Sequence, residues 1–547
     1  MGKTDSCRSP GKLQKVCSAF FVAFFLLLLL HLPLRGQQQD PPAEGPSSRA
    51  YHEGLALLNS GNYEEALNHF RQSSELAPGK PEPLYLEGVA LTLMGRVKEA
   101  NEAFKKSLAI DNRFWIARRG LATNYLREGQ VDAASAELQT VLKEAPADAA
   151  SNILAGQIHF VKKECALALT RFKIAVELVE RDTQASLMAA ECQIETGQTI
   201  SADATLRKLA GDTKLEPRYR FKIGWLYGRM GSFAEALQIF DSLPENYPDP
   251  LTRGYALAMV HFELRHYAEC IQILERLKSQ NIDDGDLFAL MGVAYDRLGK
   301  TQDASEAFAH GIRVDPKNES NYLNLAALSA HLGEWDPAVQ SVNAGIRQLP
   351  RSYRLYLCRG LLYQKQGNAL SEQDYRRAIE LAPKSPQPYE ALALSQIESG
   401  RAKEALKLLQ EADRIAPKDP GNYYLQAEAL LRMGAPVNSP NYHEALRALN
   451  TCLALDKEFI YAYYDRGKLE LGAKDAESAI ADLESARALR PESTDILYKL
   501  AQAYQKAGRT QEAAELFDLR QKMDEKQLED YNQFMLNGLA THHPDHP

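Results

Sequence analysis

A pattern of small, aromatic and proline residues recurs along most of this 547-residue chain, at a spacing of about 34 residues. The copy at residues 285–318 shows it most fully. In its first helix, apolar residues at spacings of three and four surround Gly292, and Gly299 ends the helix because such a position often needs positive φ. A second helix carries Ala304 and Phe308, with the small residues letting the helices approach and the phenylalanine filling the space beside them. This hairpin has too little core to fold alone, so it must stack on its neighbours.

The same skeleton recurs before and after this copy, and its members can be listed in chain order. They are Gly54, Gly61, Ala66, Phe70 and Pro78; Gly88, Gly95, Ala100 and Phe104; Ala122, Gly129, Ala134 and Pro146; Gly156, Ala168, Phe172 and Ala175; Ala190, Gly197 and Ala202; Gly224, Gly231, Ala236, Phe240 and Pro248; Ala258 and Leu274; then, after the 285–318 copy, Ala326, Gly333, Ala338 and Pro350; Gly360, Gly367, Ala378 and Pro383; Ala393, Gly400, Ala405, Ala412 and Pro417; Ala427, Gly434 and Ala445; Gly467, Ala479, Ala486 and Pro491; and Ala501, Gly508, Ala513 and Phe517. The copies around Lys163 and Arg265 lack the glycine between the helices, the Gly367 copy has a short second helix, and residues 435–442 insert a loop.

Many such hairpins in one register resemble the tetratricopeptide-repeat family, and the resemblance covers about residues 47–520. It implies an all-α fold, a right-handed α-solenoid of about 14 tandem helix-turn-helix repeats with a C-terminal capping helix. A solenoid grows by repetition, so a chain of this length can form one continuous body instead of several unrelated domains.

Residues 1–36 are predicted to be a targeting segment. Four basic residues (Lys3, Arg8, Lys12 and Lys15) precede an apolar run at 19–30, which is shorter than the ~20 residues that span a bilayer. This order is typical of a signal peptide, and an uncleaved membrane anchor is the alternative. In both cases the rest of the chain is expected to be exported, to the periplasm or the exterior, and to touch the membrane only through an uncleaved segment. The remaining boundaries are a polar linker at 37–46, the solenoid at 47–520, and a capping helix with a disordered tail at 521–547.

Composition and motifs argue against catalysis and against nucleic acid as the main partner. The 64 basic residues are outnumbered by 72 acidic ones, which gives a net charge of -8, whereas phosphate binding favours a basic surface. The sequence holds no phosphate-binding loop, nucleophile elbow or HExxH motif. We therefore predict no enzymatic activity, cofactor or metal site. The five cysteines outside the leader lie far apart, so no disulfide framework is indicated, and a Cys165–Cys192 pair and the oligomeric state stay open.

The resemblance implies that the first helices line a concave groove and that their outward residues hold the ligand. Glu390 is one of the residues at such an outward position. From these positions we predict that the following aromatic and charged residues contact a partner: Tyr85, Arg119, Trp225, Arg229, Tyr255, Arg297, Tyr424 and Tyr464. Such residues suit an extended peptide or a partner helix. The alternative is that the aromatic rings pack between repeats and the charges are merely solvated.

These observations predict a non-enzymatic scaffold, exported or membrane-anchored, that binds protein or peptide partners on its concave face. A cytosol-facing, membrane-tethered co-chaperone or assembly adaptor is the alternative. Chaperone-binding members of the family grip a C-terminal carboxylate with a lysine and asparagines, but the matching positions here are mostly tyrosine, leucine or valine. We also predict that charge reversal at Arg229 and Arg297 weakens partner binding without lowering the melting temperature.

Overall fold

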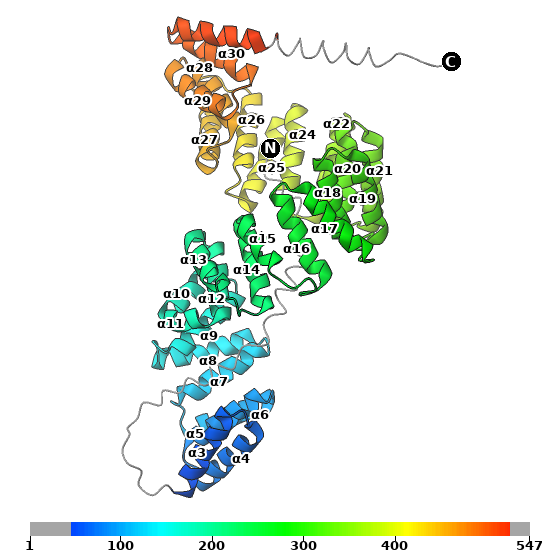
Figure 1. The fold of residues 1–547 in the computed structure, drawn as a ribbon. Helices are drawn as coiled ribbons and strands as arrows, with labels where there is room; N and C mark the ends of the chain where they lie inside the picture. Colours follow the sequence, from blue (N-terminus) through cyan, green and yellow to red (C-terminus); the bar gives the residue numbers. More distant parts are fainter. Residues whose placement is uncertain (1–44, 524, 526–547) are drawn as a thin grey trace, which may run out of the picture. The chain divides into compact units, whose positions relative to one another are not determined.

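The structure is a computed structural model that describes residues 45–523 and 525 (Figure 1). The predicted targeting segment, nearly all of the polar linker and most of the 521–547 segment lie outside these residues, so those boundaries stay predictions. Every regular element in the described part of the chain is a helix. Between residues 45 and 523, none of these helices is long and apolar enough to cross a membrane.

The chain divides into two compact units, and the first ends at Ala304. Its helices follow one another as first and second members of successive hairpins. They are α3 (Pro46–Asn59), α4 (Tyr63–Leu76), α5 (Pro81–Leu93), α6 (Val97–Ile110), α7 (Trp115–Arg127), α8 (Val131–Glu144), α9 (Ala149–Val161), α10 (Cys165–Ile174), α11 (Val176–Arg181), α12 (Thr183–Glu195), α13 (Thr199–Ala210), α14 (Pro217–Met230), α15 (Phe233–Asp241), α16 (Pro250–Glu263), α17 (Tyr267–Ser279) and α18 (Gly285–Arg297). The second helix of the α9 hairpin is divided at Ala175 into α10 and α11.

The second unit begins at Ser305, within α19 (Thr301–Val314). Its further helices are α20 (Glu319–His331), α21 (Trp335–Gln348), α22 (Tyr353–Lys365), α23 (Ser371–Leu381), α24 (Gln387–Glu398), α25 (Ala402–Ile415), α26 (Pro420–Arg432), α27 (Pro440–Leu455), α28 (Ile460–Gly472), α29 (Ala476–Leu489) and α30 (Thr494–Lys506), followed by helical residues 510–523. The short α23 and the loop before α27 confirm the two departures predicted for these copies. The alternation of helices throughout confirms the repeat architecture.

Within each unit, three kinds of helix contact build the stack. Each first helix packs on its own second helix, as α5 does on α6, and the second helix packs on the first helix of the next hairpin, as α6 does on α7. First helices also contact one another directly, as α5 does with α7 and α24 with α26. Most of the first helices in each unit therefore lie side by side.

Close approach of the helices depends on glycines that face aromatic rings. Phe104 of α6 is fully buried, and a Cβ atom added to Gly88 of α5 would lie 2.5 Å from its Cε1 atom. A Cβ atom added to Gly120 of α7 would lie 2.7 Å from Cζ of the same ring. The ring thus sits between two repeats. Rings also occupy the Cβ space of glycines in the pairs Gly54/Phe70, Gly156/Phe172, Gly224/Phe240 and Gly360/Tyr375, which confirms the predicted role of the small residue.

Helix α14 offers a matched test of this packing, because it holds two glycines in different surroundings. A Cβ atom on Gly224 would lie 2.8 Å from Phe240, whereas one on Gly228 would meet nothing within 4 Å. Gly224→Ala is expected to lower the free energy of unfolding by about 1–3 kcal/mol through overpacking. Gly228→Ala should raise it by about 1 kcal/mol, since alanine is the better helix former. Urea unfolding of both variants measures whether the unfolding free energy changes in opposite directions. A change of the same sign and size in both variants would contradict this explanation.

The turns between paired helices require a left-handed backbone residue. Gly129 adopts φ 75° there, and where the glycine is missing its place is taken by Lys163 at φ 60° and Arg265 at φ 62°. Lys474 takes the same role at φ 65°. The geometry of the turn is therefore kept even where the sequence lacks the residue that favours it.

Replacing Lys163 by glycine is expected to stabilise the protein. The left-handed conformation costs a residue with a side chain about 1–2 kcal/mol, and the greater freedom of unfolded glycine offsets about 0.5–1 kcal/mol of that gain. The net increase in unfolding free energy should be about 0.5–1 kcal/mol, measured by urea denaturation. Gly129→Lys is the reverse control and should destabilise by a similar amount. A loss of stability in Lys163→Gly would show that its side chain matters more than its backbone.

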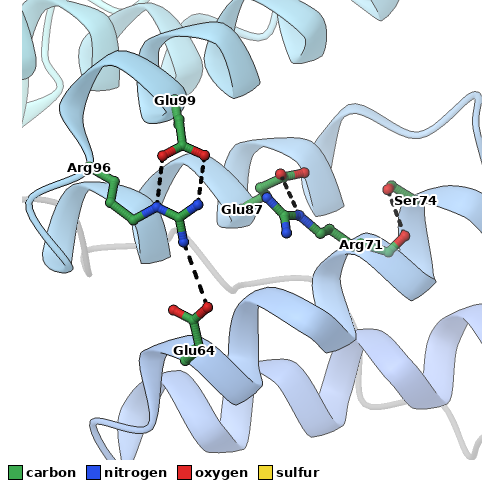
Figure 2. Close-up of polar contacts among 6 residues, drawn as sticks. All are labelled: Glu64, Arg71, Ser74, Glu87, Arg96 and Glu99. Atoms are coloured by element: carbon green, nitrogen blue, oxygen red, sulfur yellow. Dashed lines mark hydrogen bonds and ion pairs between the residues drawn. The ribbon is translucent and has the colours of Figure 1, made fainter.

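Ion pairs join successive hairpins along the edge of the stack. Arg96, the N-cap residue of α6, binds Glu99 in the first turn of its own helix and reaches Glu64 of α4 at 3.7 Å (Figure 2). Arg71 of α4 donates to Glu87 of α5 at 3.0 Å in the same view. Each pair has at least one partner that is more than a third exposed, so each pair contributes little, about 0–1 kcal/mol.

A less exposed arginine network appears twice in the second unit. Arg359 of α22 donates to both oxygens of Asp374, at 2.8 and 2.7 Å, and to Oδ1 of Asn343 in the preceding hairpin at 2.6 Å. The same arrangement joins Arg466, Asp482 and Asn450 at 2.5–2.6 Å. Each arginine therefore ties one second helix to the next hairpin. These arginine networks were not predicted from the repeat pattern.

Candidate interaction surface

The eight residues predicted to contact a partner all lie on first helices, from α5 to α28. Two of them are not available at the surface. Tyr85 is 1 % exposed and packs on Phe104 and Phe114, and Arg119 is 2 % exposed and pairs with Asp148 at 2.9 Å. Both side chains point into the contact between adjacent repeats. This burial favours the alternative of packing between repeats for Tyr85 and Arg119, and their contact with a partner stays a prediction.

Trp225 and Arg229 of α14 lie together in the first unit. Arg229 lies over the Trp225 ring at 4.9 Å, and Lys222 lies over the ring at 4.2 Å. Both cations bind Glu191 of α12, at 2.8 Å from Lys222 and 3.1 Å from Arg229, and Arg229 also binds Glu195. We call Lys222, Trp225, Arg229, Glu191 and Glu195 the tryptophan cluster. These contacts hold the Trp225 ring and its charged neighbours in place within the chain itself.

The tryptophan cluster gives Arg229 a structural role as well as a place at the surface. Its side chain is 28 % exposed and joins two first helices through its carboxylate partners. Reversing its charge would set three carboxylates together, so that variant is expected to lose stability. Arg297 is exposed at the end of α18 and is the cleaner position for a charge reversal. Tyr255 lies half-buried on α16 and is not part of the tryptophan cluster.

In the second unit, Tyr424 and Tyr464 lie on neighbouring first helices. The Tyr424 hydroxyl donates to Asp465 of α28 at 3.2 Å, and its ring packs on Phe459 and Tyr461 at 5.1 and 6.1 Å. Lys468 lies over the Tyr464 ring at 5.1 Å. Burial raises the pKa of Tyr424 far above its usual range, with Asp465 and Glu428 adding to the rise. Two carboxylates, those of Asp465 and Glu428, therefore lie close enough to this tyrosine to affect its titration.

Sequence reasoning missed Lys222 and Tyr461. Lys222 precedes Trp225 by three residues, a spacing that puts both on one helix face, so the stacking could have been predicted from the sequence. Tyr461 is 51 % exposed but stands outside the repeat position used to select candidates. Its proximity to Tyr424 depends on how α28 lies against α26, which the spacing does not specify.

No grouping of three or more metal-ligating side chains occurs among the described residues. The described cysteines are all free thiols, including Cys165 and Cys192. Burial raises the pKa of the Cys192 thiol, and the neighbouring Cys165 raises it further. Whether these two thiols pair under oxidising conditions stays a prediction.

Stacked helical hairpins, each in contact only with its neighbours, define the class of α-solenoid repeat proteins. Sequence models of the tetratricopeptide repeat match residues 51–113, 91–158, 219–250, 286–318, 360–420 and 470–535, which together make up more than half of the chain. The chain belongs to the tetratricopeptide-repeat family, as its sequence pattern predicted.

Several characterised proteins are similar to this chain. The bovine (Bos taurus) BBSome complex member BBS4 is 23 % identical over 52 % of this chain and 61 % of its own length. Anaphase-promoting complex subunit 3 of Schizosaccharomyces pombe is 21 % identical over 53 % of this chain and 43 % of its own length, and the human (Homo sapiens) DnaJ homolog subfamily C member 7 is 26 % identical over 37 % and 43 %. The chain thus matches less than two thirds of each of these relatives. Among solved structures, yeast Tom70 is 15 % identical, with a TM-score of 0.39 and coverage of 90 % of this chain and 96 % of that one.

Proposed function

We propose that this chain is a non-enzymatic scaffold that binds protein or peptide partners on the surface of its first helices. The observation that carries the proposal is the tryptophan cluster, in which Lys222 and Arg229 hold the Trp225 ring in place beside two carboxylates. Tryptophan and arginine are the residues that most often dominate binding energy at interfaces. Because the cluster is ordered by its own contacts, its side chains lose less conformational entropy when a partner binds.

The relatives support this proposal by what their names say. Two of the similar proteins are members of multi-protein complexes, the BBSome and the anaphase-promoting complex. Both resemble only part of this chain, so their particular partners are not transferred to it. They support an assembly role in general.

We further propose that the scaffold is exported, or anchored with its repeats outside the cytosol. The basic leader and the apolar run at residues 19–30 support this orientation. The second candidate is a cytosol-facing, membrane-tethered co-chaperone or assembly adaptor, which is favoured by the similarity to a DnaJ homolog. Protease treatment of sealed membrane vesicles, with the cytosolic side facing outward, separates the two. Repeats that survive digestion from the cytosolic side support export, and repeats that are digested support the co-chaperone.

Partner binding is tested by affinity capture from the native host with the full chain and three variants. Trp225→Ala and Arg297→Glu change the surface of the first helices. Arg414→Glu is the control, because its side chain is 74 % exposed on the second helix α25. A partner whose recovery falls about tenfold with either first-helix variant and is unchanged with the control supports the proposal. Equal recovery with all variants would place binding elsewhere.

A further inference from the structure

Cys165 and Cys192 lie on two helices of the first unit that contact each other. Cys165 is the first residue of α10, and Cys192 lies in the last turn of α12. The two helices run in opposite directions, because the divided second helix continues through α11 and is joined to α12 by Asp182 alone. The beginning of α10 therefore lies beside the end of α12, where the two cysteines stand.

The packing between α10 and α12 follows this antiparallel order. Ala168 of α10 and Ala189 of α12 belong to one buried cluster together with Cys192, and Cys165 packs against the same cluster. Ala168 lies three residues after Cys165, and Ala189 lies three residues before its counterpart on α12. These small side chains let the helices approach closely one turn away from the cysteines. Close approach is required for a disulfide bond, whose Cα atoms lie about 4.4–6.8 Å apart.

The two thiols differ in their access to solvent. The Cys192 side chain is fully buried, and its thiol stays protonated because burial raises its pKa and the adjacent Cys165 thiol adds to the rise. Cys165 is only half-buried, so a small disulfide in solution reaches it first. Thiol–disulfide exchange needs one accessible sulfur for its first step, and the second sulfur has to reach only the first.

We propose that Cys165 and Cys192 form a disulfide bond in an oxidising compartment and that this bond fixes α12 behind the tryptophan cluster. Glu191 and Glu195, the two carboxylates of that cluster, stand on either side of Cys192 in the sequence of α12. The bond would thus anchor to α10 the helix that supplies both carboxylates. This inference rests on the proposed export, because disulfide bonds persist in exported proteins and are rare in the cytosol.

The oxidant in this reaction is a low-molecular-weight disulfide such as glutathione disulfide. The Cys165 thiolate attacks one of its sulfur atoms, which forms a mixed disulfide and releases one glutathione thiolate. Cys192 then gives up its proton to the solvent, and its sulfur attacks the Cys165 sulfur and releases the second glutathione. The two protein thiols lose two electrons in total, and the two released glutathione molecules gain these electrons and the two protons.

The test follows this bond in the full chain. The chain is equilibrated at pH 8 with glutathione and glutathione disulfide, and its free thiols are then blocked with N-ethylmaleimide. Trypsin releases residues 164–171 and 182–207 as peptides that hold one cysteine each. Mass spectrometry should find them joined in excess glutathione disulfide and separate in excess glutathione. Peptides that stay separate in both buffers, or a glutathione that remains on Cys165, would overturn the proposal.

Hydrogen exchange measures whether the bond acts on α12. Oxidation should slow the exchange of the α12 amides about tenfold or more, because the bond restricts the separation of α12 from α10. Cys192→Ala should abolish this dependence on oxidation. Cys452→Ala is the matched control and should keep it, because Cys452 is equally buried and its cluster holds no second cysteine among the described residues. Equal α12 exchange in the oxidised and reduced chains would contradict the anchoring role.

Trapping in the native cells separates this inference from the proposed export. The cells are treated with N-ethylmaleimide before lysis, and the same two peptides are analysed. Joined peptides support both proposals. If the bond forms with glutathione disulfide but both thiols are free in the cells, the disulfide chemistry of the pair stands and the proposed export fails. If the bond forms in neither experiment, the inference fails, and protease treatment of vesicles still decides the export proposal independently.

Discussion

Replacing Phe104 by alanine is expected to lower the unfolding free energy of the surrounding repeats by about 3–5 kcal/mol. The ring is fully buried and is shared by three helices, since Gly88 of α5 and Gly120 of α7 approach it from two sides. Its removal would leave a cavity between two repeats that neither can close alone. Native-state hydrogen exchange of α5, α6 and α7 measures the local loss, because repeat arrays open in segments.

A double variant makes this prediction specific. Gly88→Ala alone should be destabilising, because its Cβ atom would meet the Phe104 ring. In the Phe104→Ala background the same methyl group enters the vacated space, so it should recover about 1 kcal/mol. A double-mutant cycle would then show a favourable coupling between the two changes. Strict additivity would mean that the glycine and the ring do not share this space.

Replacing Asp374 by alanine is expected to cost about 3 kcal/mol. Asp374 is 6 % exposed as a side chain and accepts two hydrogen bonds from Arg359, whose own side chain is only 21 % exposed. Without the carboxylate, a largely buried guanidinium keeps Asn343 but loses its counter-charge. Urea unfolding of the full chain measures the effect. Glu380→Ala is the control and should change the unfolding free energy by less than about 0.5 kcal/mol, because that pair is exposed.

The second copy of the network provides a graded comparison. Asp482→Ala removes the equivalent carboxylate from Arg466. Burial raises the pKa of Glu470 to about 7, with Asp482 adding to the rise, while Arg466 lowers it. Loss of Asp482 would let Glu470 ionise and replace it, so this variant should cost less than Asp374→Ala at pH 8. A larger cost for Asp482→Ala would contradict this exchange of partners.

The repeat register could be predicted from the sequence because it depends on local requirements. Gly129 and its counterparts lie at turns, and Gly224 faces Phe240, since helix ends and close packing constrain residue type at fixed spacing. The turns at Lys163 and Arg265 could be placed only by counting from their neighbours. Their residue types do not favour the left-handed backbone that the structure assigns to them.

The candidate surface was less predictable than the fold. The register places Tyr85, Arg119 and Glu390 at one position. Tyr85 packs on the N-cap residue of the next first helix and Arg119 pairs with the corresponding one, whereas burial and the charge of Asp419 raise the pKa of Glu390. What decides the outcome is a residue in the following repeat. A prediction made one repeat at a time does not include that residue, and for this reason the sequence left packing and binding open as alternatives at this position.

The contact with the next repeat also bears on how such a gene can grow. If the α7–α8 hairpin were duplicated in tandem, Arg119 of the first copy would face the Phe114 of the inserted copy, and only the second copy would keep Asp148. Each duplication at this junction would leave one copy of Arg119 without a carboxylate partner. Lengthening of the array is therefore expected to need a compensating substitution at the new junction, and neighbouring hairpins should change in evolution as linked pairs.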